Sequence, residues 1–232
     1  MHASPPPAED MTKYLKETQE MVRAGKHEEA LKRFVWFHEH ALEYEPAMSG
    51  VRRSFALGFW KKLGEAYPPA LEAMIAIRDA DEQLLREGKG SSSLFHDLFA
   101  LNSTLEEEKK TLELFEVIQA VDPQKAKTYW IIVKHMVLAL KRYDLAKLFI
   151  PDAEAEFDRV KSRFVALYDR SKTGAEKVRD FLEGHFVQEV RDLVEFALAT
   201  GNREVALTIR DKALTVLDDD RLRLEIAPPD LG

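Results

Sequence analysis

The sequence predicts an all-α fold of stacked antiparallel helical hairpins, with roughly 9–12 helices in all. Long stretches are rich in Ala, Leu, Glu, Lys and Arg, which are strong helix formers, and we find no strand–turn–strand pattern. Apolar residues recur at helical spacing, as Val160, Phe164 and Leu167 do. Glycine and proline interrupt this pattern, so we expect helices of about 12–20 residues joined by short turns.

The composition limits the classes of protein to which the chain can belong. It has 232 residues, of which 45% are hydrophobic, enough to bury one large core or two small ones. The absence of cysteine excludes disulfides, thiol catalysis and cysteine-ligated metals. With 34 basic and 41 acidic residues the net charge is −7, which argues against a nucleic-acid partner. No apolar run approaches the roughly 18–20 residues that span a bilayer, so we expect no membrane partner.

Both ends of the chain are expected to be loose. Residues 1–10 contain three consecutive prolines and lack the basic and apolar regions of a signal peptide, which predicts a disordered N-terminal tail. Residues 219–232 are predicted to form a C-terminal tail. Because we find no targeting signal, a cytoplasmic location is the expectation.

One segment carries a repeat motif. The pattern W-x-x-L-G-x-x-Y stands in WKKLGEAY, at Trp60, Leu63, Gly64 and Tyr67. The small glycine of such a motif lets two helices approach, while the large residues fill the space around it. Spacing typical of the second helix of a repeat occurs around Ala30 in GKHEEALKRF. On these residues the chain resembles the tetratricopeptide-repeat family, which implies an α-solenoid with a right-handed superhelical course.

The repeat units start near residues 11, 57, 92, 127 and 187, which are 46, 35, 35 and 60 residues apart. The two middle spacings match the consensus period of about 34 residues. The last gap leaves room for an additional helical insert over about residues 153–185. We therefore predict a single repeat domain over residues 11–218. An irregular helical bundle is the alternative, because the motif is degenerate and Pro68 directly follows Tyr67.

The resemblance implies that a partner binds the concave face, which the first helix of each repeat lines. The fifth and ninth positions of those helices are Leu15, Gln19, Lys61, Glu65, His96, Ala100, Ile131, His135, Arg191 and Glu195. Arg53 belongs to a local basic cluster with Arg52 and Lys61. The residues that we predict to contact a partner are Gln19, Arg53, Lys61, Glu65, His96, His135, Arg191 and Glu195.

Two residues of this set, Lys61 and Glu65, indicate which kind of partner to expect. Family members that bind acidic chaperone tails have Lys at the fifth position and Asn at the ninth. Lys61 fits that pattern, but Glu65 would repel a carboxylate. We therefore do not expect acidic chaperone tails to bind.

No residues have catalytic or metal-binding spacing. His38 and Glu39 could begin a helical zinc motif, but the motif requires a second histidine at position 42, where this chain has Leu42. His40 lies on nearly the opposite side of the helix from His38, so the two cannot share a metal. We interpret both histidines as surface residues. The run over residues 88–93 lacks phosphate-loop spacing and is interpreted as a linker between repeats. No catalytic, cofactor or metal site is predicted.

The leading hypothesis for function is a non-enzymatic scaffold that binds another protein or a peptide on a concave helical surface. The alternative is a regulatory helical-repeat protein that senses a small ligand or a short peptide. An enzyme would need a convergent cluster, such as His96, His135 and Glu65, in a deep cleft.

The last predicted helix, over about residues 204–218, has apolar residues on more than one face. Either Leu222, Leu224 and Ile226 fold back over it, or a second subunit covers it. The second option predicts a homodimer through the terminal helices.

Overall fold

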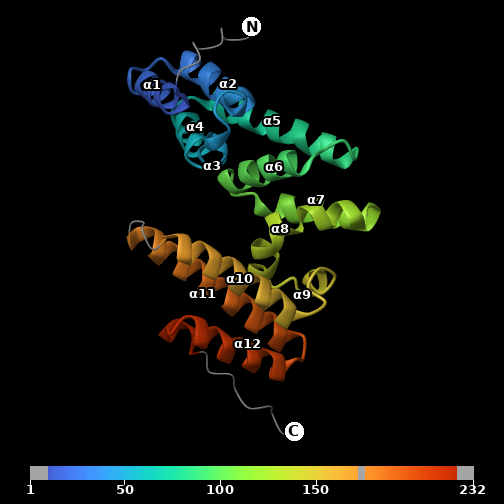
Figure 1. Cartoon of the computed structure of the whole chain (residues 1–232). Coiled ribbons are helices and arrows are strands. Elements are labelled where there is room, and N and C mark those ends of the chain that lie inside the picture. Colours follow the sequence, from blue (N-terminus) through green and yellow to red (C-terminus); the bar gives the residue numbers. More distant parts are fainter. Residues whose placement is uncertain (1–9, 172–175, 224–232) are drawn as a thin grey trace. The chain divides into compact units, whose positions relative to one another are not determined.

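The computed structural model describes residues 10–171 and 176–223 of the chain (Figure 1). Within these residues the structure has twelve α-helices, two short 3-10 helices and no strand, which confirms the all-α prediction. None of the described helices is both long and apolar enough to cross a membrane. The chain divides into two compact units, unit 1 (Met1–Ile132) and unit 2 (Val133–Gly232). The single repeat domain stays a prediction.

Unit 1 consists of consecutive helices with short connections, in the order of the chain. They are α1 (Met11–Arg23), α2 (His27–Tyr44), η1 (Pro46–Met48), α3 (Ser49–Arg52), α4 (Phe55–Ala66), α5 (Pro68–Arg86), α6 (Ser92–Thr104), α7 (Glu108–Val121) and the first part of α8 (Pro123–Ala139). Four helices begin at or within a few residues of predicted repeat starts 11, 57, 92 and 127.

Local sequence signals explain where these helices begin. The Asp10 side chain accepts hydrogen bonds from the backbone amides of Thr12 and Lys13, and so caps α1. Ser91 caps α6 in the same way. Pro68 stands at the first position of α5, where a missing N–H costs no helical hydrogen bond. The proline that departs from the repeat motif therefore starts the second helix of the hairpin.

The helices α4 and α5 form a tight hairpin around the motif. Trp60 is 1% exposed, and its indole N–H donates to the carbonyl oxygen of Ala70 at 2.8 Å. Gly64 is buried, and a Cβ atom built on it would lie 3.1 Å from the Cβ of Leu71. The glycine therefore allows the two helices to approach closely. Further along unit 1, α4 also contacts α6, and α5 contacts both α6 and α7.

Unit 2 contains the rest of α8, α9 (Tyr143–Ala146), α10 (Ala153–Ser171), α11 (Glu176–Ala199), α12 (Arg203–Val216) and η2 (Asp220–Leu222). The helices α10, α11 and α12 all contact one another and form a three-helix bundle (Figure 1). Its core includes the stacked rings of Phe164 and Phe186, with centroids 4.3 Å apart. No helix begins near the predicted repeat start at residue 187, because α11 runs through it without a proline.

The residues after α12 partly answer the question of what covers this helix. Leu222 is fully buried, and η2 contacts both α11 and α12. Leu222 thus folds back over the bundle. This is the first of the two alternatives that the sequence left open for covering the last helix. Leu224 and Ile226 lie outside the described residues, as do residues 1–9 of the predicted N-terminal tail. The homodimer stays a prediction.

Candidate functional site

Five of the eight predicted partner-binding residues lie in unit 1. Gln19 is half-buried on α1, and Glu65 is exposed on α4. The Lys61 ammonium lies 2.6 Å from Glu106 Oε1. Arg53 donates to Asp97 Oδ1 at 2.6 Å, while His96 is exposed on α6 beside that aspartate. Two of the cationic groups are therefore already paired with carboxylates, which leaves them less available to a partner.

The pair of arginines after η1 is mainly structural. Arg52 is 6% exposed and donates to the buried carboxylate of Asp97, which also receives Arg53. Arg52 also lies 3.5 Å from His38 Nδ1. Because arginine can only donate, this nitrogen of His38 accepts and carries no proton.

His38 is 7% exposed, so its interpretation as a surface residue was wrong. The side chain occupies the interior of unit 1 and packs edge-on against Trp60. Burial, together with the charge of Arg52, lowers the pKa of His38 to about 4. A residue next to an exposed position on a helix can still reach the core. The sequence pattern alone therefore does not distinguish a buried histidine from a surface histidine here. His40 is half-buried, with Glu43 3.1 Å from its Nδ1.

The other three predicted residues, His135, Arg191 and Glu195, belong to unit 2. Arg191 is half-buried and Glu195 is exposed, both on α11. Glu195 lies near the phenol of Tyr143, whose pKa is raised by burial and by the charge of this carboxylate. His135 belongs to a larger cluster of titratable groups, described next.

A buried network of charges lies beneath His135. Lys134 is 2% exposed, and its ammonium lies 2.8 Å from Glu156 Oε1 and 3.2 Å from Glu189 Oε1. Arg163 also pairs with the Glu189 carboxylate. Burial by itself would raise the pKa of Glu189, but the hydrogen bonds from His135 and Arg163 lower it overall. Glu189 is therefore ionised, and its ion pairs with Lys134 and Arg163 link α8 and α10 to α11.

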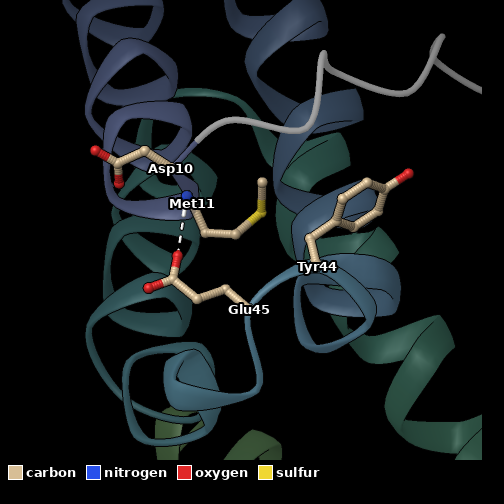
Figure 2. A pocket seen from close by; sticks show the side chains of 4 residues that line it. All are labelled: Asp10, Met11, Tyr44 and Glu45. Atoms are coloured by element: carbon tan, nitrogen blue, oxygen red, sulfur yellow. Dashed lines mark hydrogen bonds between the residues drawn. The ribbon is translucent and has the colours of Figure 1, made fainter.

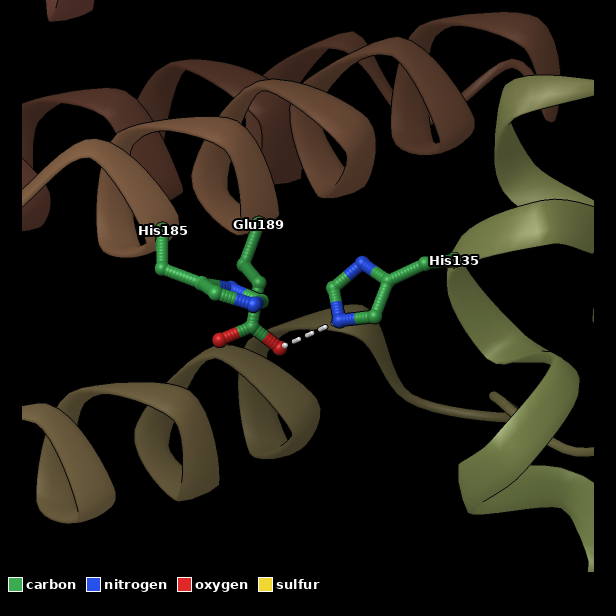
Figure 3. Close-up of side chains that lie close together, drawn as sticks. All are labelled: His135, His185 and Glu189. Carbon is green, nitrogen blue, oxygen red and sulfur yellow. Dashed lines mark ion pairs between the residues drawn. The ribbon is translucent and has the colours of Figure 1, made fainter. Parts of the chain in front are cut away.

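His135 lies at the edge of this network, where its ring is paired with the Glu189 carboxylate (Figure 3). Its Nε2 is 3.3 Å from Glu189 Oε1, and its Nδ1 is 3.6 Å from Asp192 Oδ2. Hydrogen bonds to Asp192 and to Glu189 raise the pKa of His135 to about 9. The ring of His185 lies beside it, with centroids 5.3 Å apart.

A pocket of about 430 Å³ opens at this point, lined by His135, Ala139, His185, Gln188 and Asp192. Three of these residues lie on α11 at intervals of three and four, and so share one side of the helix. The same side continues toward the helix N-terminus with Phe181, 65% exposed, and Val178, 47% exposed. We call Val178, Phe181, His185, Gln188 and Asp192 the α11 face. The Phe181 and His185 rings are in edge contact, with centroids 5.6 Å apart.

A second pocket, of about 340 Å³, lies between the start of α1 and the end of α2 in unit 1 (Figure 2). Its lining consists of Asp10, Met11, Tyr44 and Glu45. The backbone amide of Met11 donates to Glu45 Oε2 at 3.2 Å. This contact satisfies a free N–H at the helix start and ties α1 to the end of α2, which is a structural role.

Sequence reasoning identified His135 but missed the residues that surround it. His185 and Glu189 have an i, i+4 spacing that places them on one side of a helix, and this signal is present in the sequence. Their proximity to His135 follows only from the packing of α8 against α11. Phe181 also carried no signal, because a lone phenylalanine in a helical pattern indicates a core residue first.

The chain matches no family model, no curated protein and no solved structure in comparisons with known proteins. The resemblance to tetratricopeptide repeats thus rests on the motif residues alone.

Proposed function

We propose that this chain is a non-enzymatic interaction module that binds a protein or a peptide on the α11 face of unit 2. The observation that carries the proposal is the exposed ring of Phe181. A phenyl group that is 65% exposed offers apolar area that a partner can cover, and here its ring contacts His185, which lines the pocket. Val178 extends the apolar part of the surface by one turn.

The α11 face combines an apolar end with a polar end. Phe181 and Val178 provide area that a partner can bury, and an aromatic anchor of this kind contributes roughly 1.5–3 kcal/mol when fully covered. His185, Gln188 and Asp192 offer hydrogen-bonding groups at the pocket. An amphipathic helix or an extended peptide with an apolar residue beside polar ones would suit this surface.

The helical-repeat arrangement is part of the proposal. The contacts of α4 with α6, and of α5 with α7, are those expected when successive hairpins stack in register. The close approach at Gly64 supports the tetratricopeptide-like character of the α4–α5 hairpin. Such a stack would form an α-solenoid and present the scaffold on which the binding face is held.

The proposal is tested by affinity capture from the native host with the whole chain. We compare the wild type with Phe181→Ser and with the control Phe55→Ser, which removes a phenyl group of similar exposure (68%) from unit 1. A specific protein should be retained by the wild type and the control but lost by Phe181→Ser, with helicity unchanged by circular dichroism. Retention by all three chains would contradict a binding role for the α11 face.

Sensing of a small ligand is the second candidate, and the pocket beside His135 favours it. A pocket of about 430 Å³ with two imidazoles and a carboxylate in its lining is large enough for a small polar molecule. If no protein is captured by the wild type, a thermal-shift screen of small polar compounds becomes the next test. A compound that stabilises the wild type but not Asp192→Ala would support this function.

A further inference from the structure

Three side chains with metal-binding atoms converge at the polar end of the α11 face (Figure 3). His185 and Glu189 project from successive turns of α11, and His135 reaches toward them from α8. One ligand atom from each of the three residues lies within 4.8 Å of the other two. Small side-chain rotations would bring these atoms to the separations found around a bound transition-metal ion.

The surroundings of His135 are those of a metal-binding histidine. Histidine ligands commonly donate their second ring N–H to a carboxylate, which fixes the ring orientation. Asp192 Oδ2 lies 3.6 Å from Nδ1 of His135, on the side of the ring away from Glu189. Asp192 can therefore hold the ring through Nδ1, while Nε2, which is paired with Glu189 in the metal-free chain, would release its proton to become the ligand atom. The pocket borders both imidazoles and leaves room for a solvent molecule or a further ligand.

A metal ion at Glu189 would also experience the charges of the neighbouring basic and acidic groups. Lys134 and Arg163 pair with Glu189, and Arg159 pairs with Glu156 at 3.1 Å. Three carboxylates, those of Glu156, Glu189 and Asp192, stand against these three basic groups. A carboxylate offers about four lone-pair directions, so Glu189 can keep its two ion pairs and still accept a metal. The basic groups will weaken the binding relative to a closed site with four ligands.

We propose that His135, His185 and Glu189 bind one Zn²⁺ ion, with a fourth coordination position directed at the pocket. Two imidazole nitrogens and one carboxylate are a donor set that suits zinc and disfavours Mg²⁺ or Ca²⁺, which require mostly oxygen. The proposal does not depend on the proposed partner, because it concerns binding to the isolated chain. It also goes beyond the sequence, which predicted no metal site.

The test is a titration of the full chain, purified without a histidine tag and freed of metal by a chelator. Zn²⁺ binding is measured by calorimetry, and Co²⁺ absorption serves as a spectroscopic probe of the ligands. The variants are His185→Gln and Asp192→Asn, with His96→Gln as the control. His185 and His96 are both exposed, so neither substitution disturbs the core. Circular dichroism confirms that each variant retains its helices.

The wild type and His96→Gln should each bind one Zn²⁺ with the same affinity. Asp192→Asn should weaken binding by roughly 10–100-fold, the usual effect of removing a carboxylate behind a histidine ligand. His185→Gln should weaken it more than that and should abolish the Co²⁺ absorption bands. The proposal is overturned if the wild type binds no Zn²⁺. It is equally overturned if His185→Gln binds zinc as well as the wild type does, since the ion would then reside on other histidines.

Discussion

Asp81 is a half-buried carboxyl group on α5 whose folded environment opposes its ionisation. Burial and the nearby charge of Asp97 raise its pKa to about 6, from 3.8 for an unperturbed aspartate. The folded chain therefore holds this proton more tightly than the unfolded chain does. The resulting contribution to stability is complete below pH 3.8 and is lost as the pH rises through about 6.

Replacing Asp81 with Asn should accordingly raise the free energy of unfolding at about pH 8 and change it less at about pH 5. The reason is that Asn removes a desolvated charge that exists only at the higher pH. Urea denaturation at both pH values measures the effect, with the exposed Asp158→Asn as a control. A loss of stability that is the same at both pH values would contradict this account of Asp81.

Single residues also show where sequence reasoning succeeds and where it fails. The roles of Trp60 and Gly64 could be predicted, because a local motif defines both the packing and the close approach. The burial of His38 could not, because it depends on Arg52 and Asp97, which come from other helices. The same holds for His135, whose partners Glu189 and Asp192 lie more than fifty residues away in the chain.

At the scale of elements, local signals define helix starts better than repeat boundaries. Capping by Asp10 and Ser91, and the proline at position 68, make the starts of three helices readable from the sequence. The predicted start at residue 187 has no such signal, and α11 instead forms one helix of 24 residues. Its length follows from packing against both α10 and α12, which a periodic pattern alone does not specify.

The α4–α5 hairpin gives a prediction with a matched control on the same helix. Gly64→Val should lower the free energy of unfolding by about 1–3 kcal/mol, because the added atoms would overlap Leu71. Gly58 is exposed, and a Cβ built on it would have no neighbouring atom within 4 Å. Gly58→Val should therefore change the free energy of unfolding by only about a few tenths of a kcal/mol. Chemical denaturation compares the two. Equal effects at both positions would show that the hairpin does not require a glycine at its contact.

At the scale of the whole molecule, the two units carry different features. Unit 1 holds the repeat motif and most of the predicted groove residues, two of which, Arg53 and Lys61, are occupied by internal ion pairs. Unit 2 holds the α11 face, with its exposed Phe181 and the pocket beside His135. The proposed binding surface therefore lies on a different part of the chain from most of the residues that the resemblance indicated.

The most direct test of the proposed binding face places a photo-cross-linking amino acid at position 181 of the whole chain, and in a separate chain at position 55. Both positions hold a phenylalanine and are exposed to a similar extent, at 65% and 68%. After irradiation in the native host, we expect a specific covalent adduct with another protein from position 181 and none from position 55. Absence of an adduct at position 181, or the same adduct from both positions, would contradict the assignment of the α11 face as the binding surface.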